Sequence, residues 1–201
     1  MRTQPTSRRI LRQHGFTLIE AMISMAILTV GSLGLLGVFG LAVRSQQIAQ
    51  QDIIARQLAS EAIESIYTAR NSSEIVWGQI QNVSNGGIFI DGMQYLKCSG
   101  PDGILDTADD TSCLTASGAV CPNGGVECLT EPGPDGIMGT ADDVILSLNN
   151  YQRQIQIAAL NDSSGNPIQT LNQITITIQY TVPNATDTRN YTLIEYISAY
   201  H

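Results

Sequence analysis

The feature that most constrains the fold is an apolar run near the start of the chain. Between Phe16 and Val43, 28 residues include a single charged side chain, that of Glu20. At about 1.5 Å per residue, a helix of this length measures roughly 42 Å, which exceeds the hydrocarbon thickness of a bilayer. The run therefore predicts a membrane-spanning helix.

The flanks of this run predict its orientation. Four arginines and no acidic residue precede it, whereas only Arg44 directly follows it. Because cytoplasmic flanks of membrane helices are rich in Lys and Arg, we expect a cytoplasmic N-terminus. The run is longer than the apolar part of a secretory signal, about 7 to 15 residues, and no clear Ala-x-Ala cleavage site follows it. A carboxylate in hydrocarbon costs on the order of 2.5 kcal/mol or more, so Glu20 needs a partner.

The stretch "GFTLIE", residues 15–20, supplies a reason for that carboxylate. With basic residues before it and an apolar helix after it, it resembles the class III signal of type IV pilins and pseudopilins. The resemblance implies that a prepilin peptidase cuts between Gly15 and Phe16, and that Phe16 is then N-methylated. It also implies that Glu20 neutralises the terminal ammonium of a neighbouring subunit, which leaves neither charge unpaired in an apolar filament core. The alternative is an ordinary single-pass anchor.

A second helical pattern follows directly, over residues 44–70. If it continues the membrane helix, residues 16–70 form one helix of roughly 82 Å. With this segment included, the chain most resembles PilV-type minor pilins, also called type IV pilus modification proteins, over residues 8–71. That resemblance implies a long helix, half in the membrane and half on a globular head. The pattern itself consists of apolar residues at three- and four-residue steps: Ile48, Ala55, Leu58, Ala59, Ala62, Ile66 and Ala69.

The C-terminal part predicts an antiparallel sheet. Residues 173–182, "QITITIQYTV", alternate between apolar and polar side chains, as a half-buried strand does. Residues 151–160 and 190–200 show a similar pattern, and residues 86–96 are a weaker candidate. The expected fold class is α+β, with the long helix packed on a sheet of three or four strands.

An acidic motif occurs twice between the helix and the sheet. "GPDGILDTADD" at 100–110 returns as "GPDGIMGTADD" at 133–143, with nine of eleven positions identical. Clustered carboxylates suit Ca²⁺, which takes about six to eight oxygen ligands, although the spacing is not that of an EF-hand. The alternative is a pair of turns in which Asp caps its own backbone. The candidate ligands are Asp102, Asp106, Asp109 and Asp110 in the first copy, and Asp135, Asp142 and Asp143 in the second.

Four cysteines lie in the same region, at positions 98, 113, 121 and 128. No two of them have the C-x-x-C spacing, and the chain has only two histidines. Disulfides formed in an oxidising compartment therefore explain the cysteines better than a zinc site does. Cys98–Cys113 with Cys121–Cys128 is the preferred pairing, since the first bridge would enclose the first acidic loop. A crossed pairing stays open.

The composition argues against two function classes. His201 is the only histidine beyond the leader, and no GxxxxGK[ST] or GxGxxG loop occurs, so we do not expect an enzyme. Removal of the leader takes four of the ten basic residues and no acid, which leaves a net charge of −12. We therefore do not expect nucleic-acid binding.

The expected function is a minor pilin subunit of a type IV pilus, incorporated into the filament or priming its assembly. A type II secretion pseudopilin and a calcium-dependent adhesive tip module are the alternatives. Expected partners are other pilins, prepilin peptidase and the assembly platform; the expected location is the inner membrane, then the pilus or pseudopilus. The expected regions are a leader (1–15), a membrane and filament-core helix (16–43), its amphipathic half (44–70) and a periplasmic or extracellular head (71–201) that includes the Cys- and Asp-rich region 98–143.

Overall fold

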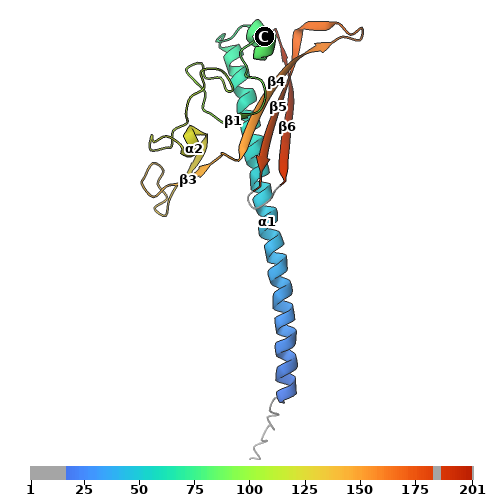
Figure 1. Ribbon diagram of the computed structural model, residues 1–201, viewed down its shortest axis with the longest axis vertical. Coiled ribbons are helices and arrows are strands. Elements are labelled where there is room, and N and C mark those ends of the chain that lie inside the picture. Colours follow the sequence, from blue (N-terminus) through green and yellow to red (C-terminus); the bar gives the residue numbers. More distant parts are fainter. Residues whose placement is uncertain (1–16, 183–186, 201) are drawn as a thin grey trace, which may run out of the picture. The chain divides into compact units, whose positions relative to one another are not determined.

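The computed structural model describes residues 17–182 and 187–200 of the chain. They belong to two compact units, Met1–Gln46 and Gln47–His201, which we describe separately. One helix, α1 (Leu18–Asn71), contributes to both units (Figure 1). The predicted helix began at Phe16, which lies outside the described residues, and ended one residue earlier, at Arg70.

In the first unit, α1 is exposed on every face from Leu18 to Gln46, although most of its side chains are apolar. By length and composition, α1 contains a segment that could cross a membrane, and no other helix among the described residues does. A helix that is apolar all round is stable when lipid or other protein covers it. This segment therefore requires such an environment.

In the second unit, the C-terminal half of α1 packs on a sheet (Figure 1). Of the seven apolar positions predicted to form the helix stripe, all are buried except Ile48, which is partly buried. Alanine fills four of the buried positions, Ala55, Ala59, Ala62 and Ala69, and its small side chain lets the helix axis approach the sheet closely.

The sheet has four antiparallel strands in the order β1-β4-β5-β6. The predicted fold class is thereby confirmed. Its inner face carries isoleucines in register, such as Ile155 opposite Ile176, while threonine and glutamine occupy the outer positions of β5. The strands are β1 (Gln94–Tyr95), β4 (Tyr151–Asn161), β5 (Pro167–Thr181) and β6 (Thr188–Ser198).

The weaker strand candidate, residues 86–96, is mostly irregular. Only Gln94 and Tyr95 pair with β4, because Gly86 and Gly92 adopt left-handed backbone angles that interrupt an extended chain. Two short 3₁₀ helices, η1 (Trp77–Gln79) and η2 (Val83–Asn85), precede this segment. Next to η2, the buried side chain of Asn82 accepts from Ile157 N–H at 2.8 Å and donates to Ile155 C=O at 2.8 Å. An amide side chain thus satisfies the edge of β4 where β1 has ended.

A β-hairpin that the sequence analysis did not predict directly precedes β4 in the chain. It consists of β2 (Cys128–Glu131) and β3 (Val144–Ser147), and it follows a one-turn helix, α2 (Pro122–Gly125). The second acidic repeat is the loop of this hairpin. Disulfides join Cys98 to Cys113 and Cys121 to Cys128, which is the preferred pairing.

Candidate functional site

The N-terminal candidate site is described only in part. Gly15 and Phe16, the expected cleavage and methylation positions, lie outside the described residues. Glu20 is exposed in the first turn of α1, where a negative charge is favourable near the positive end of the helix dipole. Its backbone N–H donates to Thr17 Oγ1 at 3.4 Å, and Thr17 C=O accepts from Ala21 N–H at 3.1 Å. Thr17 thus caps the start of the helix.

The two acidic loops, loop 1 (residues 100–110) and loop 2 (residues 133–143), share one hydrogen-bonded turn. The aspartates accept bonds from backbone N–H groups and from a threonine hydroxyl of their own loop, as in the alternative interpretation of the repeat. The three shortest side-chain bonds of loop 1 recur in loop 2: Ile104 N to Asp102 Oδ1 (2.9 Å) and Ile137 N to Asp135 Oδ1 (2.8 Å); Asp106 N to Asp110 Oδ2 (2.8 Å) and Gly139 N to Asp143 Oδ2 (2.7 Å); Thr107 Oγ1 to Asp109 Oδ1 (2.7 Å) and Thr140 Oγ1 to Asp142 Oδ1 (2.6 Å).

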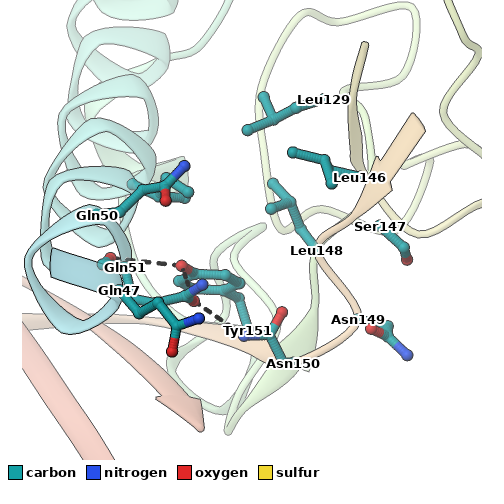
Figure 2. A pocket seen from close by; sticks show the side chains of 11 residues that line it. Gln47, Gln50, Gln51, Leu129, Leu146, Ser147, Leu148, Asn149, Asn150 and Tyr151 are labelled. Atoms are coloured by element: carbon teal, nitrogen blue, oxygen red, sulfur yellow. Dashed lines mark hydrogen bonds between the residues drawn. The ribbon is translucent and has the colours of Figure 1, made fainter. Parts of the chain in front are cut away.

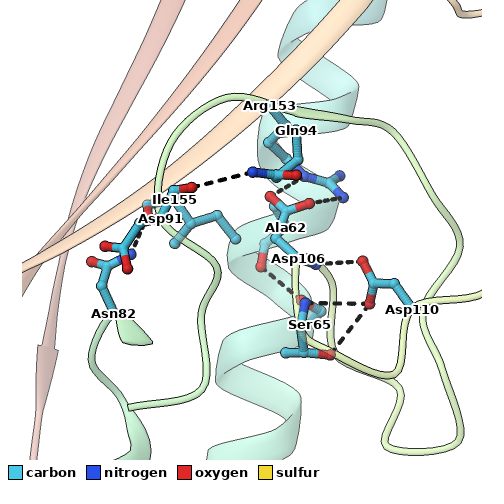
Figure 3. A network of polar contacts seen from close by, with 10 residues as sticks. Ala62, Ser65, Asn82, Asp91, Gln94, Asp106, Asp110, Arg153 and Ile155 are labelled. Atoms are coloured by element: carbon cyan, nitrogen blue, oxygen red, sulfur yellow. Dashed lines mark hydrogen bonds and ion pairs between the residues drawn. The ribbon is translucent and has the colours of Figure 1, made fainter. Parts of the chain in front are cut away.

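Loop 1 is fixed to the core by a buried ion pair. Arg153 of β4 donates through Nε to Asp106 Oδ2 at 2.9 Å and through a terminal nitrogen to Asp106 Oδ1 at 3.1 Å (Figure 3). Both side chains are buried, and the other terminal nitrogen of Arg153 has no hydrogen-bond partner. Asp106 therefore serves as the counter-ion of Arg153 in this structure.

Further carboxylates surround this ion pair. Burial raises the pKa of Asp110 to about 6, against the effect of the hydrogen bonds that it accepts from Thr107 and Asp106. Burial, and then the charge of Glu61, raise the pKa of Glu127 to about 7. The hydrogen bond from Thr107 lowers the pKa of the exposed Asp109. The buried Arg153 thus interacts with the charges of Asp106, Glu127 and Glu61.

The loops do not assemble a metal centre in this arrangement. Within residues 17–182 and 187–200, no group of three or more His, Cys, Asp or Glu side chains is placed to hold a metal ion. Asp106 is directed at Arg153, and the remaining aspartates of the two loops are engaged in their own turns. Calcium binding by the seven aspartates stays a prediction from the sequence: Asp102, Asp106, Asp109, Asp110, Asp135, Asp142 and Asp143.

A hollow of about 430 Å³ lies between α1 and the segment from β2 to β4 (Figure 2). One side of the hollow is lined by Leu129, Leu146 and Leu148, and the other side is lined by glutamines of α1. Gln51 accepts a hydrogen bond from the Tyr151 hydroxyl through its side-chain oxygen. The lining contains amides, hydroxyls and apolar groups but no carboxylate, histidine or thiol, so it offers packing and hydrogen bonding rather than acid–base chemistry.

Comparison with known proteins bears on the N-terminal site. Residues 10–36 match the family model of the prokaryotic N-terminal methylation motif. The match supports a type IV pilin-like protein. It includes Gly15, Phe16 and Glu20, and it implies processing by prepilin peptidase and assembly with other pilins. No curated protein and no solved structure matches the chain.

Sequence reasoning missed Arg153 and Glu127, which shape the electrostatics of the head. Arg153 could have been found, because it lies on the same face of the predicted strand as Tyr151, Ile155 and Ile157. A charge in the inward register of an apolar strand needs a buried partner. For Glu127, whose burial depends on how the disulfide-linked segments pack, no local pattern gives a signal.

Proposed function

We propose that the protein is a minor pilin subunit of a type IV pilus. The observation that carries the proposal is the methylation motif at residues 10–36, which runs into a single unbroken helix, Leu18–Asn71. The first part of this helix is apolar on every face, as a segment needs to be if it resides first in a bilayer and then among other helices. A bundle of such helices is a reasonable filament core.

In this proposal, each part of the N-terminal segment has a role. Prepilin peptidase cuts after Gly15 on the cytoplasmic side, and Phe16 becomes the methylated first residue. The new ammonium group is cationic near neutral pH, and its transfer into an apolar core is favourable only if a carboxylate accompanies it. Glu20 of a neighbouring subunit supplies that carboxylate, and the pair sets the axial position of the incoming helix.

The proposal extends to location and partners. We infer an inner-membrane protein with a cytoplasmic N-terminus before assembly, which then joins other pilins at the assembly platform. A type II secretion pseudopilin would share the motif and the helix, and it is the alternative. For the PilV-type subfamily and for a calcium-dependent adhesive role, the support is the sequence pattern alone.

Mass spectrometry of the membrane-extracted protein tests the proposal. We expect a mature chain that begins at N-methylated Phe16, and a Gly15→Val variant that keeps its leader. Gly31→Val is the matched control, because a side chain added at Gly31 meets no atom within 4 Å and the cleavage position is untouched. A mature chain that begins near Val43 would indicate ordinary signal peptidase and would contradict the proposal. Detection of the mature chain in sheared pili, rather than in a secretion complex, would separate the pilus from the pseudopilus.

A further inference from the structure

The two acidic loops have one turn structure but opposite surroundings. In loop 1, the apolar dipeptide at the centre of the motif is buried: Ile104 is 0% exposed and Leu105 is 4% exposed. In loop 2, the equivalent residues lie in solvent, with Ile137 59% exposed and Met138 52% exposed. The same hydrogen-bonded scaffold therefore presents an apolar pair to the core in one copy and to solvent in the other.

Loop 1 shows what kind of surface such a scaffold packs against. Ile104 and Leu105 belong to the hydrophobic core that α1 and the sheet form, and the next residue, Asp106, pairs with Arg153. The acceptor for loop 1 is thus an apolar pocket with a guanidinium group beside it. Loop 2 has Gly139 where loop 1 has Asp106, so its attraction to a cation would come from the acids around the dipeptide.

Loop 2 also extends an apolar surface of its hairpin. Val144 and Leu146 of β3 are exposed on one face of the hairpin, where Leu129 of β2 pairs with Leu146 at the rim of the hollow, and Ile145 is exposed on the other face. Beyond the strand pairing of β2 with β3, the backbone of loop 2 bonds only within the loop among the described residues. Contiguous exposed apolar side chains on a soluble surface mark an interaction site.

The negative charge around loop 2 indicates which kind of partner surface it can bind. No basic residue occurs between Lys97 and Arg153, while nine acidic residues do. Glu131, Asp135, Asp142 and Asp143 all lie on the hairpin or its loop. A second copy of the same hairpin would bring like charges together, and an anionic lipid surface would repel it as well. Charge complementarity favours a protein surface that carries Lys or Arg.

We propose that Ile137 and Met138 are a docking element that inserts into an apolar pocket rimmed by Lys or Arg on a different protein subunit. The contact is the intermolecular counterpart of loop 1 in its own core. Because β2 and β3 hold both ends of the loop, and Cys128 at the start of β2 is tied to Cys121, the turn is already formed before docking and little conformational entropy is lost. The inference goes beyond the proposed function, since filament incorporation depends on residues 15–20 and docking depends on the head.

Site-specific photo-crosslinking in the producing cells tests the proposal. A photoreactive residue replaces Ala141, which is exposed in loop 2, and the same residue at Ser164, exposed in the turn between β4 and β5, is the matched control. We expect a discrete adduct from position 141 and none of the same mass from position 164. Peptide mapping should place the adduct on a different protein, at an apolar segment that contains Lys or Arg.

A second arm removes the apolar pair but leaves the crosslinker in place. With Ile137→Ser and Met138→Ser, the adduct should fall about tenfold or more, as expected when the central anchors of an interface are truncated. The melting temperature should stay the same, because both side chains are exposed. An adduct that survives these substitutions, maps to a second copy of this chain, to lipid or to an acidic segment, or fails to form, would overturn the proposal. The start of the mature chain, read in the same cells, reports separately on the proposed function.

Discussion

Arg153 is a charged side chain that is fully buried in the head. Its guanidinium is buried among α1, loop 1 and β4, and Asp106 is its only hydrogen-bonded partner among the described residues. We expect Asp106→Asn to lower the free energy of unfolding by about 3–5 kcal/mol, because it leaves a buried charge uncompensated. Thermal and urea unfolding of the detergent-solubilised chain would measure this change.

The double variant Asp106→Gly with Arg153→Met supplies the control for this effect. Loop 2 has glycine at the equivalent position, so the turn accepts it, and methionine replaces the guanidinium with an apolar group of similar length. The double variant should be more stable than Asp106→Asn alone. Asp187→Asn, at an exposed position, should change stability by less than about 0.5 kcal/mol. Equal losses in the three variants would show that the ion pair has no special role.

Glu127 makes stability depend on pH. Burial, and then the charge of Glu61, raise its pKa from 4.5 to about 7 in the folded chain. The folded state therefore binds a proton more tightly than the unfolded state, and the resulting stabilisation is complete below pH 4.5 and is lost as the pH rises through about 7. We expect the melting temperature to fall between pH 5 and pH 8, by the equivalent of about 1–3 kcal/mol.

Substitution of Glu127 by Gln isolates this effect. The variant should be more stable than the natural chain at pH 8, and its melting temperature should depend less on pH; Asp110, whose pKa is about 6, accounts for the remaining slope. Glu64→Gln, at an exposed position on the same helix as Glu61, is the matched control and should leave the pH profile unchanged. A flat profile in the natural chain would contradict the prediction.

At the scale of single residues, the sequence predicted the disulfides but not the buried ion pair. Four cysteines in a short segment of a chain expected outside the cytoplasm predicted disulfides, and the structure has the preferred pairing rather than the crossed one that the sequence left open. The role of Asp106 did not follow, because the motif places it with other carboxylates, whereas its partner Arg153 is 47 positions away in the sequence. Only the fold brings those two residues together.

At the scale of elements, Gly100 and Gly133 give a matched comparison of the two acidic loops. A Cβ atom at Gly100 would clash with the backbone oxygen and the carboxylate of Asp109, and one at Gly133 would clash with the same atoms of Asp142. Alanine at either position must therefore distort the local turn. Because loop 1 is part of the core and loop 2 is not, we expect Gly100→Ala to cost about 1–3 kcal/mol and Gly133→Ala less than about 1 kcal/mol, measured by thermal unfolding. Equal costs would show that loop 2 supports the fold as much as loop 1 does.

The elements differ in how well the sequence predicts them. Strands β4, β5 and β6 have a period-two pattern because one face is buried, and the stripe of α1 has a helical period for the same reason. The hairpin β2–β3 has no such signal: the strand Val144–Ser147 begins with three exposed apolar residues. Its four backbone pairs, Cys128 with Ser147 through Glu131 with Val144, therefore have no burial pattern in the sequence that would predict them.

At the scale of the whole molecule, the sequence predicts two parts with different roles, an apolar helix and a globular head, and the α+β fold contains both. An apolar helix carries the methylation motif, and an α+β head carries the disulfides and both acidic loops.

In the proposed function, Glu20 pairs with the terminal ammonium of a neighbouring subunit, and this role can be tested. Glu20→Gln should leave insertion into the membrane intact, because the helix becomes no more polar, yet it should reduce incorporation into filaments by about tenfold or more, because the ammonium of a neighbouring subunit would lose its counter-charge. Ser24→Ala is the matched control: it removes only the bond from Ser24 Oγ to the Glu20 carbonyl, and it should be neutral. The ratio of protein in sheared pili to protein in the membrane, measured by immunoblot, gives the readout. Normal incorporation of the Gln variant would mean that packing of the apolar helix alone positions the subunit, and the charge at Glu20 would need another explanation.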